Sequence, residues 1–214
     1  VRDYPGQDGQ RGQDIIQVKN MSAKAGRGEQ GFDFTKLDEV GDEVDDPSQD
    51  WSCVRDNITG LIWEVKSAAI SADLYSNNHT YTWYQERDDS VFDGDVSGAA
   101  ATCGVALGNT SQYVAEVNAQ SLCNFKDWRL PTHEELLSIV HFGQEAAPLI
   151  DQAYFPYTTD LLTSPVWYWT QNSSADGIAN DGAHNAWAID FASGNDNFLN
   201  KFEAANIRLV RAGR

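Results

Sequence analysis

The sequence predicts an α+β protein in which antiparallel strands come before and after two helices. The first observation is a change of hydrophobic period along the chain. Apolar residues alternate up to Lys66 and again from Val166 onward, whereas they recur at helical spacing between Ser111 and Val140. The second observation is that long polar loops separate the strands, which favours α+β architecture over repeated strand–helix–strand units.

The first part of the chain predicts an arm, a strand and a hairpin. Residues 1–30 are rich in Gly, Gln and charged residues and lack apolar periodicity, so we expect an N-terminal arm followed by one domain over residues 31–214. The spacing of Phe32, Phe34 and Leu37 predicts a short strand. Alternating residues on both sides of a polar turn then predict a β-hairpin over residues 51–66.

Two helices are expected in the middle of the chain. Val114 and Val117 give residues 111–121 the pattern of an amphipathic helix. Pro131 biases Leu130 toward an extended backbone, and Thr132 and Glu135 have the spacing of a capping box, so a second helix should start at Thr132. Its buried face is predicted to carry the apolar residues Leu136, Ile139 and Val140.

The remaining strands are expected over residues 166–170, 186–191 and 207–211. Trp128, Leu130 and Leu136 are expected in the core. The segments between these strands are rich in Asn and Asp and are predicted to be exposed loops.

Several segments resemble, in order, the C-terminal domain of Legionella collagen-like proteins. The strongest is Asp127-Trp128-Arg129-Leu130-Pro131-Thr132, followed after one residue by Glu134-Glu135-Leu136. The others occur at residues 31–38, 51–66, 81–84, 150–156, 168–170, 186–191 and 207–211. The resemblance implies a C-type-lectin-like fold, export to the cell surface or the extracellular space, and a binding role in adhesion rather than catalysis. It does not supply a ligand.

The resemblance also bears on how the three cysteines pair. Cys53 and Cys123 are the favoured disulfide pair, because the close partner that many relatives have about a dozen residues after the position of Cys103 is replaced here by Gly108-Asn109-Thr110. Cys103 would then be free or bonded to another chain. The alternative is three buried thiols in a reduced protein.

The formal net charge of −17 limits the partners. Phosphates of nucleic acid, sulfated glycans and anionic membrane surfaces would all be repelled. Neither Lys nor Arg occurs at residues 130–200, so a ligand seated there should be neutral, cationic or bridged by a cation. No stretch approaches the length of a membrane span, and we interpret the abrupt start at Val1 as that of a mature or trimmed chain.

One segment has the spacing of a calcium loop. Asp93, Asp95 and Ser97 alternate in the sequence Asp-Gly-Asp-Val-Ser-Gly, and a tight turn can converge their oxygens on calcium. The distal Glu of an EF-hand is absent, since Gly104 occupies the twelfth position. A plain acidic turn is therefore the alternative to a calcium site.

The polar loops near the C-terminus are the candidate binding surface. Carboxylates and amides can bond sugar hydroxyls, and tryptophans can stack on sugar rings. The residues predicted to contact a ligand are Trp169, Asn172, Asp176, Asn180, Asp181, His184, Asn185, Trp187, Asn195, Asp196 and Asn197. The alternative is that Asn and Asp merely form turns, and that strand aromatics such as Trp169 point into the core.

Catalytic motifs are missing. The four histidines show no metal-ligand spacing, and there is no nucleophile elbow, Cys-x-x-Cys pair or phosphate-binding loop. We therefore expect no enzyme and no cofactor other than calcium. The predicted function is recognition of a neutral glycan or a protein on a surface. The alternative is a subunit or tip component of a surface filament or envelope assembly, with a second copy or a filament neighbour as partner.

Overall fold

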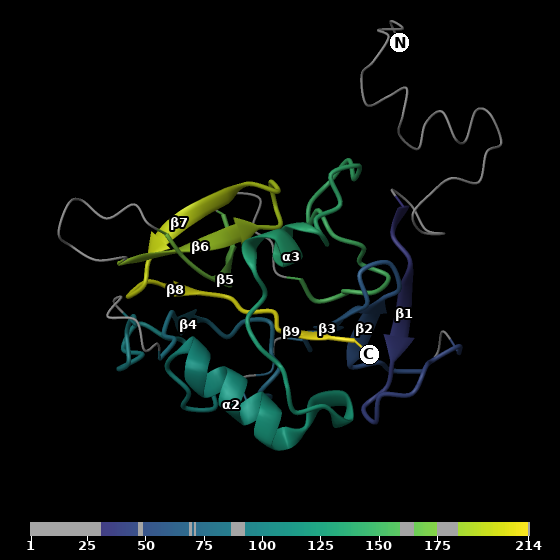
Figure 1. The fold of residues 1–214 in the computed structure, drawn as a ribbon, viewed down its shortest axis with the longest axis horizontal. Coiled ribbons are helices and arrows are strands. Elements are labelled where there is room, and N and C mark those ends of the chain that lie inside the picture. The colour runs from purple at the N-terminus through teal and green to yellow at the C-terminus, as the bar shows by residue number, and fades with distance from the viewer. Residues whose placement is uncertain are drawn as a thin grey trace, which may run out of the picture.

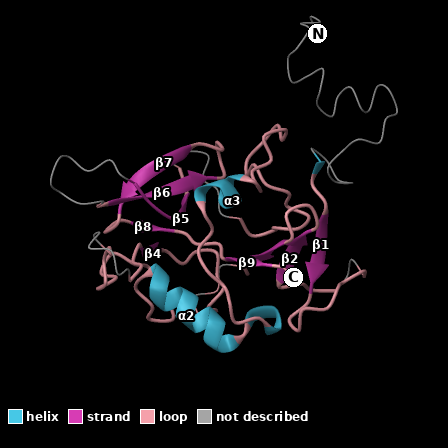
Figure 2. Cartoon of the chain, in the orientation of Figure 1, coloured by secondary structure: helices cyan, strands magenta, loops and turns pink. Residues whose placement is uncertain are grey.

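The computed structural model describes residues 31–46, 49–68, 70, 72–86, 93–158, 165–174 and 184–213. The expected arm at residues 1–30 lies outside them. Among the described residues, strands form three separate antiparallel sheets and two α-helices pack beside them (Figures 1 and 2). The predicted α+β class is confirmed.

The first sheet holds the predicted hairpin. Its strand order is β1-β2-β3-β9, and the strands run over Phe34–Leu37, Cys53–Asp56, Leu61–Glu64 and Val210–Ala212. The hairpin turn forms because both carboxylate oxygens of Asp56 accept hydrogen bonds, from the Ile58 amide at 2.9 Å and the Thr59 hydroxyl at 2.6 Å. The last strand was expected to begin at Ile207, but the sheet ladder starts only at Val210.

Helix α2 (Thr110–Gln120) is tied to the segment that leads into helix α3 (His133–Leu137). The Asn118 side chain accepts from the Trp128 amide at 2.8 Å and donates to the Trp128 carbonyl at 2.9 Å. A short 3-10 helix, η3 (Leu122–Asn124), lies between them. Trp128, Leu130 and Leu136 are almost fully buried, as predicted.

The capping box at α3 is confirmed atom by atom. The Thr132 hydroxyl accepts from the Glu135 amide at 3.1 Å, and a Glu135 carboxylate oxygen accepts from the Thr132 amide at 2.8 Å. Arg129 holds the same carboxylate through two hydrogen bonds of 2.7 Å. Burial acts to raise the pKa of Glu135, but the bonds from Arg129 and Thr132 outweigh it and lower that pKa.

The other sheets lie toward the far end of the molecule from the hairpin (Figure 1). Strands β5 (Trp167–Ser174), β6 (Asn185–Asp190) and β7 (Asp196–Asn200) form one sheet in that order. Strands β4 (Tyr81–Thr82) and β8 (Ala204–Ala205) form a two-stranded sheet. Strand β7 is a correction, because the Asn- and Asp-rich segment at residues 195–197 was predicted to be loop.

Two apolar clusters lie on opposite faces of β5 and β6. Trp169 and Ala188 belong to the cluster that also holds Trp83, Tyr113 and Trp128. Tyr168 and Ile189 belong to the cluster that holds Trp63, Leu136 and Phe155. Because successive side chains of a strand point to opposite faces, both faces of this sheet are buried where the clusters meet it. The edge strand β7 is the most exposed part of the sheet.

Candidate ligand-binding surface

Three strands bring four of the predicted contact residues, Asn172, Asn185, Trp187 and Asp196, together on one sheet face. Cross-strand pairing places Trp187 opposite Phe198, and Asn185 opposite Asn200. Ile189, two residues after Trp187 on β6, is buried beneath α3, whereas Trp187 is only half-buried. The open end of this face, named here the β6–β7 surface, consists of Asn172, Asn185, Trp187, Asp196, Phe198 and Asn200, with His133 from α3 at its border.

Aromatic rings form the centre of the β6–β7 surface. The Trp187 ring meets the Phe198 ring edge-on, with centroids 5.8 Å apart, and meets the His133 ring with centroids 5.6 Å apart. Phe198 keeps 40% of its surface exposed. A single exposed apolar side chain is common on protein surfaces, but here the Phe198 ring is paired with the Trp187 ring, so the two form one aromatic patch.

Polar groups fix the position of the aromatic rings. The Nε2 atom of His133 lies 2.8 Å from a carboxylate oxygen of Asp196, which links α3 to β7. The Asn172 side chain accepts a hydrogen bond from the His133 amide at 2.8 Å. The first turn of α3 is therefore anchored to β5 and β7 at once, and His133 is held beside Trp187.

Hydrogen bonds also fix the turn that leads into β7. Asp190 is buried, and its carboxylate accepts hydrogen bonds from the amides of Val166, Ala192 and Ser193 and from the Ser193 hydroxyl. Gly194 adopts a positive φ of 72°, and a side chain there would collide with the Phe142 ring. This turn sets the register that places Phe198 beside Trp187.

The predicted contact residues do not all lie on this surface. Asn172, Asn185, Trp187 and Asp196 lie on the β6–β7 surface; Asn195 is exposed in the turn before β7, and Asn197 is exposed on the opposite side of the strand. His184 is half-buried just before β6, where its carbonyl accepts from the Lys201 amide. Asp176, Asn180 and Asp181 lie outside the described residues.

Trp169 is a correction. None of its surface is exposed, and its ring nitrogen donates to the Tyr81 carbonyl at 2.8 Å. It is a core residue that joins β5 to β4. Conversely, sequence reasoning did not place His133 or Phe198 at the site, because the strand that carries Phe198 was not predicted.

The predicted calcium segment forms a tight turn. One carboxylate oxygen of Asp95 accepts from the Ser97 amide at 2.9 Å and from the Ser97 hydroxyl. Burial acts to raise the pKa of Asp95, but these hydrogen bonds outweigh it and lower that pKa. Across the described part of the chain, no three His, Cys, Asp or Glu side chains gather as a metal site would need. Calcium binding by Asp93, Asp95 and Ser97 stays a prediction, which a calcium-dependent rise in melting temperature would support.

The disulfide prediction is confirmed. Cys53 on β2 is bonded to Cys123 in η3, with 6.5 Å between their Cα atoms. Cys103 is a free thiol beside the His79 ring and the Tyr81 hydroxyl. The bond ties the hairpin sheet to the segment after α2.

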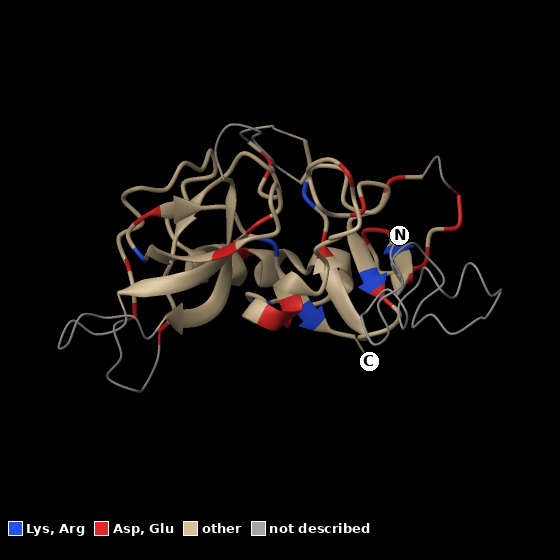
Figure 3. Cartoon of the chain, turned by 90° about the horizontal axis from the view of Figure 1, so that it is seen from above, with Lys and Arg blue, Asp and Glu red and all other residues tan. Residues whose placement is uncertain are grey.

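Two further features of the described residues are the distribution of charge and the character of the helices. Acidic positions are spread over the described chain, whereas Lys and Arg positions are scattered singly (Figure 3). No helix in the described ranges has the length and apolar content of a membrane span.

No curated protein gives a match to this chain. A family model does match, over residues 52–211, which is well over half of the chain and includes both α-helices, the disulfide and the β6–β7 surface. The segments that carried the resemblance in the sequence fall in this range, except for residues 31–38, which precede it, and the first residue of the segment at 51–66. The chain therefore belongs to the Lcl C-terminal domain family, a family of surface-associated domains.

Proposed function

We propose that this protein is an exported bacterial binding domain that recognises a neutral glycan or a protein on a surface through the β6–β7 surface. The observation that carries the proposal is the exposed aromatic centre of that surface, formed by Trp187 and Phe198 and bordered by amide and carboxylate groups. We also propose that the fold is C-type-lectin-like, which family membership supports.

The chemistry of the β6–β7 surface suits an uncharged polymer with hydroxyl groups. Aromatic rings can pack against the apolar face of a sugar, while Asn185, Asp196 and Asn200 can bond its hydroxyl groups. His133 is fixed by Asp196, so little conformational entropy is lost when a ligand contacts the ring.

Electrostatics favour a neutral partner over a polyanion. The strands and α3 contribute no Lys or Arg to the β6–β7 surface, and Lys201, which follows β7, is buried with its ammonium 4.2 Å from the centroid of the Trp83 ring. Sulfates or phosphates would meet the Asp196 carboxylate there, and the His133 imidazole at the border is already bonded to that carboxylate. We therefore expect the affinity to change little as salt is added.

An assembly role is the second candidate. Strand β7 is at the edge of its sheet, pairs only with β6 among the described strands, and has four of its five residues exposed. An edge of this kind can accept a strand from a neighbouring subunit. Ordered polymers or a stable multimer of the purified protein would favour this candidate.

A combined glycan and protein array, with and without calcium and at two salt concentrations, tests the proposal. We expect binding to neutral glycans or to a protein, and loss of that binding in Phe198→Ser. Ile58→Ser is the matched control, because Ile58 is 43% exposed in the hairpin turn, at the other end of the molecule (Figure 1). Heparin or nucleic acid as the tightest ligand would refute the proposal.

A further inference from the structure

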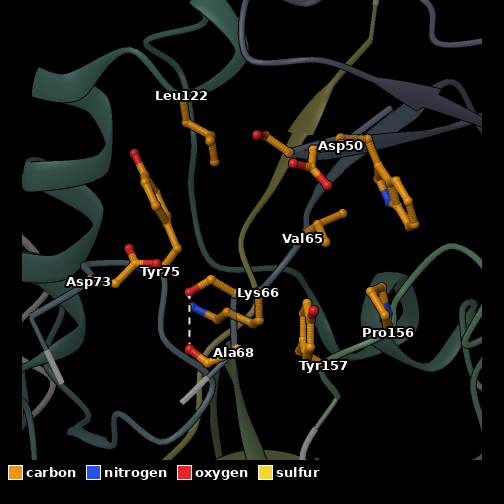
Figure 4. Close-up of a pocket in the computed structure, with 12 residues that line it drawn as sticks. Asp50, Val65, Lys66, Ala68, Asp73, Tyr75, Leu122, Pro156 and Tyr157 are labelled. Carbon is orange, nitrogen blue, oxygen red and sulfur yellow. Dashed lines mark hydrogen bonds between the residues drawn. The ribbon is translucent and has the colours of Figure 1, made fainter. Parts of the chain in front are cut away.

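A separate pocket lies beside the hairpin sheet. It has a volume of about 420 Å³, within the range of small-molecule sites. Its wall is assembled from five parts of the chain, which contribute Asp50 and Trp51, Val65 and Lys66, Asp73 and Tyr75, Leu122, and Tyr157. In Figure 4 these side chains surround an open centre, with Tyr75 and Tyr157 on different sides of it.

Three of the lining side chains are aromatic. The ring faces of Tyr75 and Tyr157 can attract a cation through the negative charge of the π-system. Trp51 already holds a cation of the protein itself, because the Lys36 ammonium lies 3.4 Å from the centroid of its ring. Tyr157 is 45% exposed, so its ring is accessible from solvent.

Carboxylates add negative charge to the same wall. Asp73 uses one oxygen to accept from the Tyr75 amide at 3.0 Å, and no described residue donates to its other oxygen or to the Asp50 carboxylate. A second hollow of about 460 Å³ shares Asp73 and Tyr75 and adds Glu116. Burial is the main reason why the pKa of Tyr75 is raised to about 12, and the carboxylates of Glu64, Asp73 and Glu116 add to the rise.

The single basic residue of the pocket wall does not offset this charge. The Lys66 ammonium is 2.7 Å from a Glu64 carboxylate oxygen and 2.7 Å from the Tyr113 hydroxyl. Lys66 and Glu64 are both almost fully buried and neutralise one another. Asp73 also attracts the Lys66 ammonium, though less than Glu64 does, and the Lys36 ammonium lies over the Trp51 ring. The two carboxylates of Asp50 and Asp73 still outnumber the basic groups at the pocket that Glu64 does not neutralise.

We propose that this pocket binds an organic cation, an alkylammonium or guanidinium group held between the Tyr75 and Tyr157 rings and the Asp50 and Asp73 carboxylates. The cation can be a free amine or the side chain of a Lys or Arg residue in a peptide. The site is distinct from the β6–β7 surface, and its ligand differs in charge.

Titration calorimetry with two cationic probes tests the site. The probes are n-pentylammonium and the peptide acetyl-Gly-Gly-Lys-Gly-Gly-amide, and n-pentanol is the neutral comparison. We expect at least one cation to bind, the alcohol to bind about tenfold more weakly, and Asp50→Asn with Asp73→Asn to weaken cation binding about tenfold. Asparagine at position 73 keeps the oxygen that accepts from the Tyr75 amide, so the turn is preserved.

The control is the pair Glu39→Gln with Glu203→Gln, which removes the same charge from exposed positions outside the pocket. It should leave the affinity unchanged. Binding of the peptide alone would identify a side chain of a partner as the source, and binding of pentylammonium alone would identify a free amine. The proposal is wrong if neither cation binds at millimolar concentration, if the alcohol binds as tightly, or if the control pair loses as much affinity as the pocket pair.

Discussion

At the scale of single residues, the protein buries charged side chains as a connected group. Glu64 has no exposed surface; it accepts hydrogen bonds from Lys66, Tyr113 and the Leu209 amide, and its carbonyl accepts from Arg208. Burial is the largest influence on the pKa of Lys66 and lowers it, while the Glu64 charge acts to raise it. The buried charges are tolerated because each is paired with an opposite charge or with hydrogen-bonding partners in the same group.

Lys66→Ala should therefore destabilise the protein strongly. Removing the ammonium leaves the Glu64 charge buried without its cation, which costs about 3–5 kcal/mol. The free energy of unfolding from urea titration measures the loss. As a control, Arg55→Ala removes an exposed ion pair with Glu43 and should cost at most about 1 kcal/mol. Equal losses in the two variants would contradict this account of the buried group.

Alkaline pH should also destabilise the protein through Tyr75. Its pKa is raised from 10.0 to about 12 in the folded state, so the unfolded chain loses the proton first as pH increases. The stability that neutral Tyr75 contributes is complete below pH 10.0 and is lost as pH rises through about 12. Melting temperatures across this range should fall less in Tyr75→Phe than in the original protein. An identical fall in both would show that Tyr75 makes no contribution.

At the scale of elements, the start of α3 decides where His133 lies. Thr132 caps a helix of only five residues, which is too short to be stable without its tertiary contacts. Leu136 packs in the core beneath it, and Asn172 fixes its first amide. The cap, the core contact and β5 thus act together to place the imidazole beside Trp187.

Thr132→Ala should cost about 1 kcal/mol of stability, because the Glu135 amide loses its acceptor. Thr132→Ser keeps a hydroxyl at the same position and should restore most of the loss. Urea titration of both variants gives the comparison. If the alanine variant is as stable as the serine variant, the cap has no role in holding α3.

The elements also show what sequence can and cannot predict. The start of α3 was predictable because a capping box is a local pattern of Thr132 and Glu135. Strand β7 was not, because Asn195, Asp196 and Asn197 favour turns and only the next two residues are apolar. Pairing with β6 imposes the extended conformation there, which is a tertiary effect that overrides local propensity.

At the scale of the whole molecule, apolar clusters lie on opposite faces of β5 and β6. They determine which aromatic residues of these strands are buried and which can contact a ligand. Tyr168 and Trp169 are consecutive, and each is buried in a different cluster. Hydrophobic period cannot identify an exposed face in such a strand, so Trp169 was placed on the surface by sequence reasoning. Trp187 is half-buried, and its ring contacts His133 at the start of α3.

The distribution of charge is a global property that can be read directly from the sequence. The absence of Lys and Arg from residues 130–200 leaves the strands of the β6–β7 surface without a basic side chain. Composition alone does not locate a site, however. The surface exists because the Asp190 turn folds β7 back along β6, which no count of residues reveals.

Hydrogen–deuterium exchange, with and without the ligand selected by the array, tests most directly whether the ligand binds on the β6–β7 surface. Binding should slow amide exchange in β6, in β7 and at the start of α3, while exchange in the hairpin at residues 53–64 stays unchanged. Amide exchange in the turn at residues 191–195 should slow together with that in β7, because hydrogen bonds to Asp190 hold this turn rigid. Protection confined to the hairpin or to residues 31–46, with none in β6 and β7, would contradict binding at this surface.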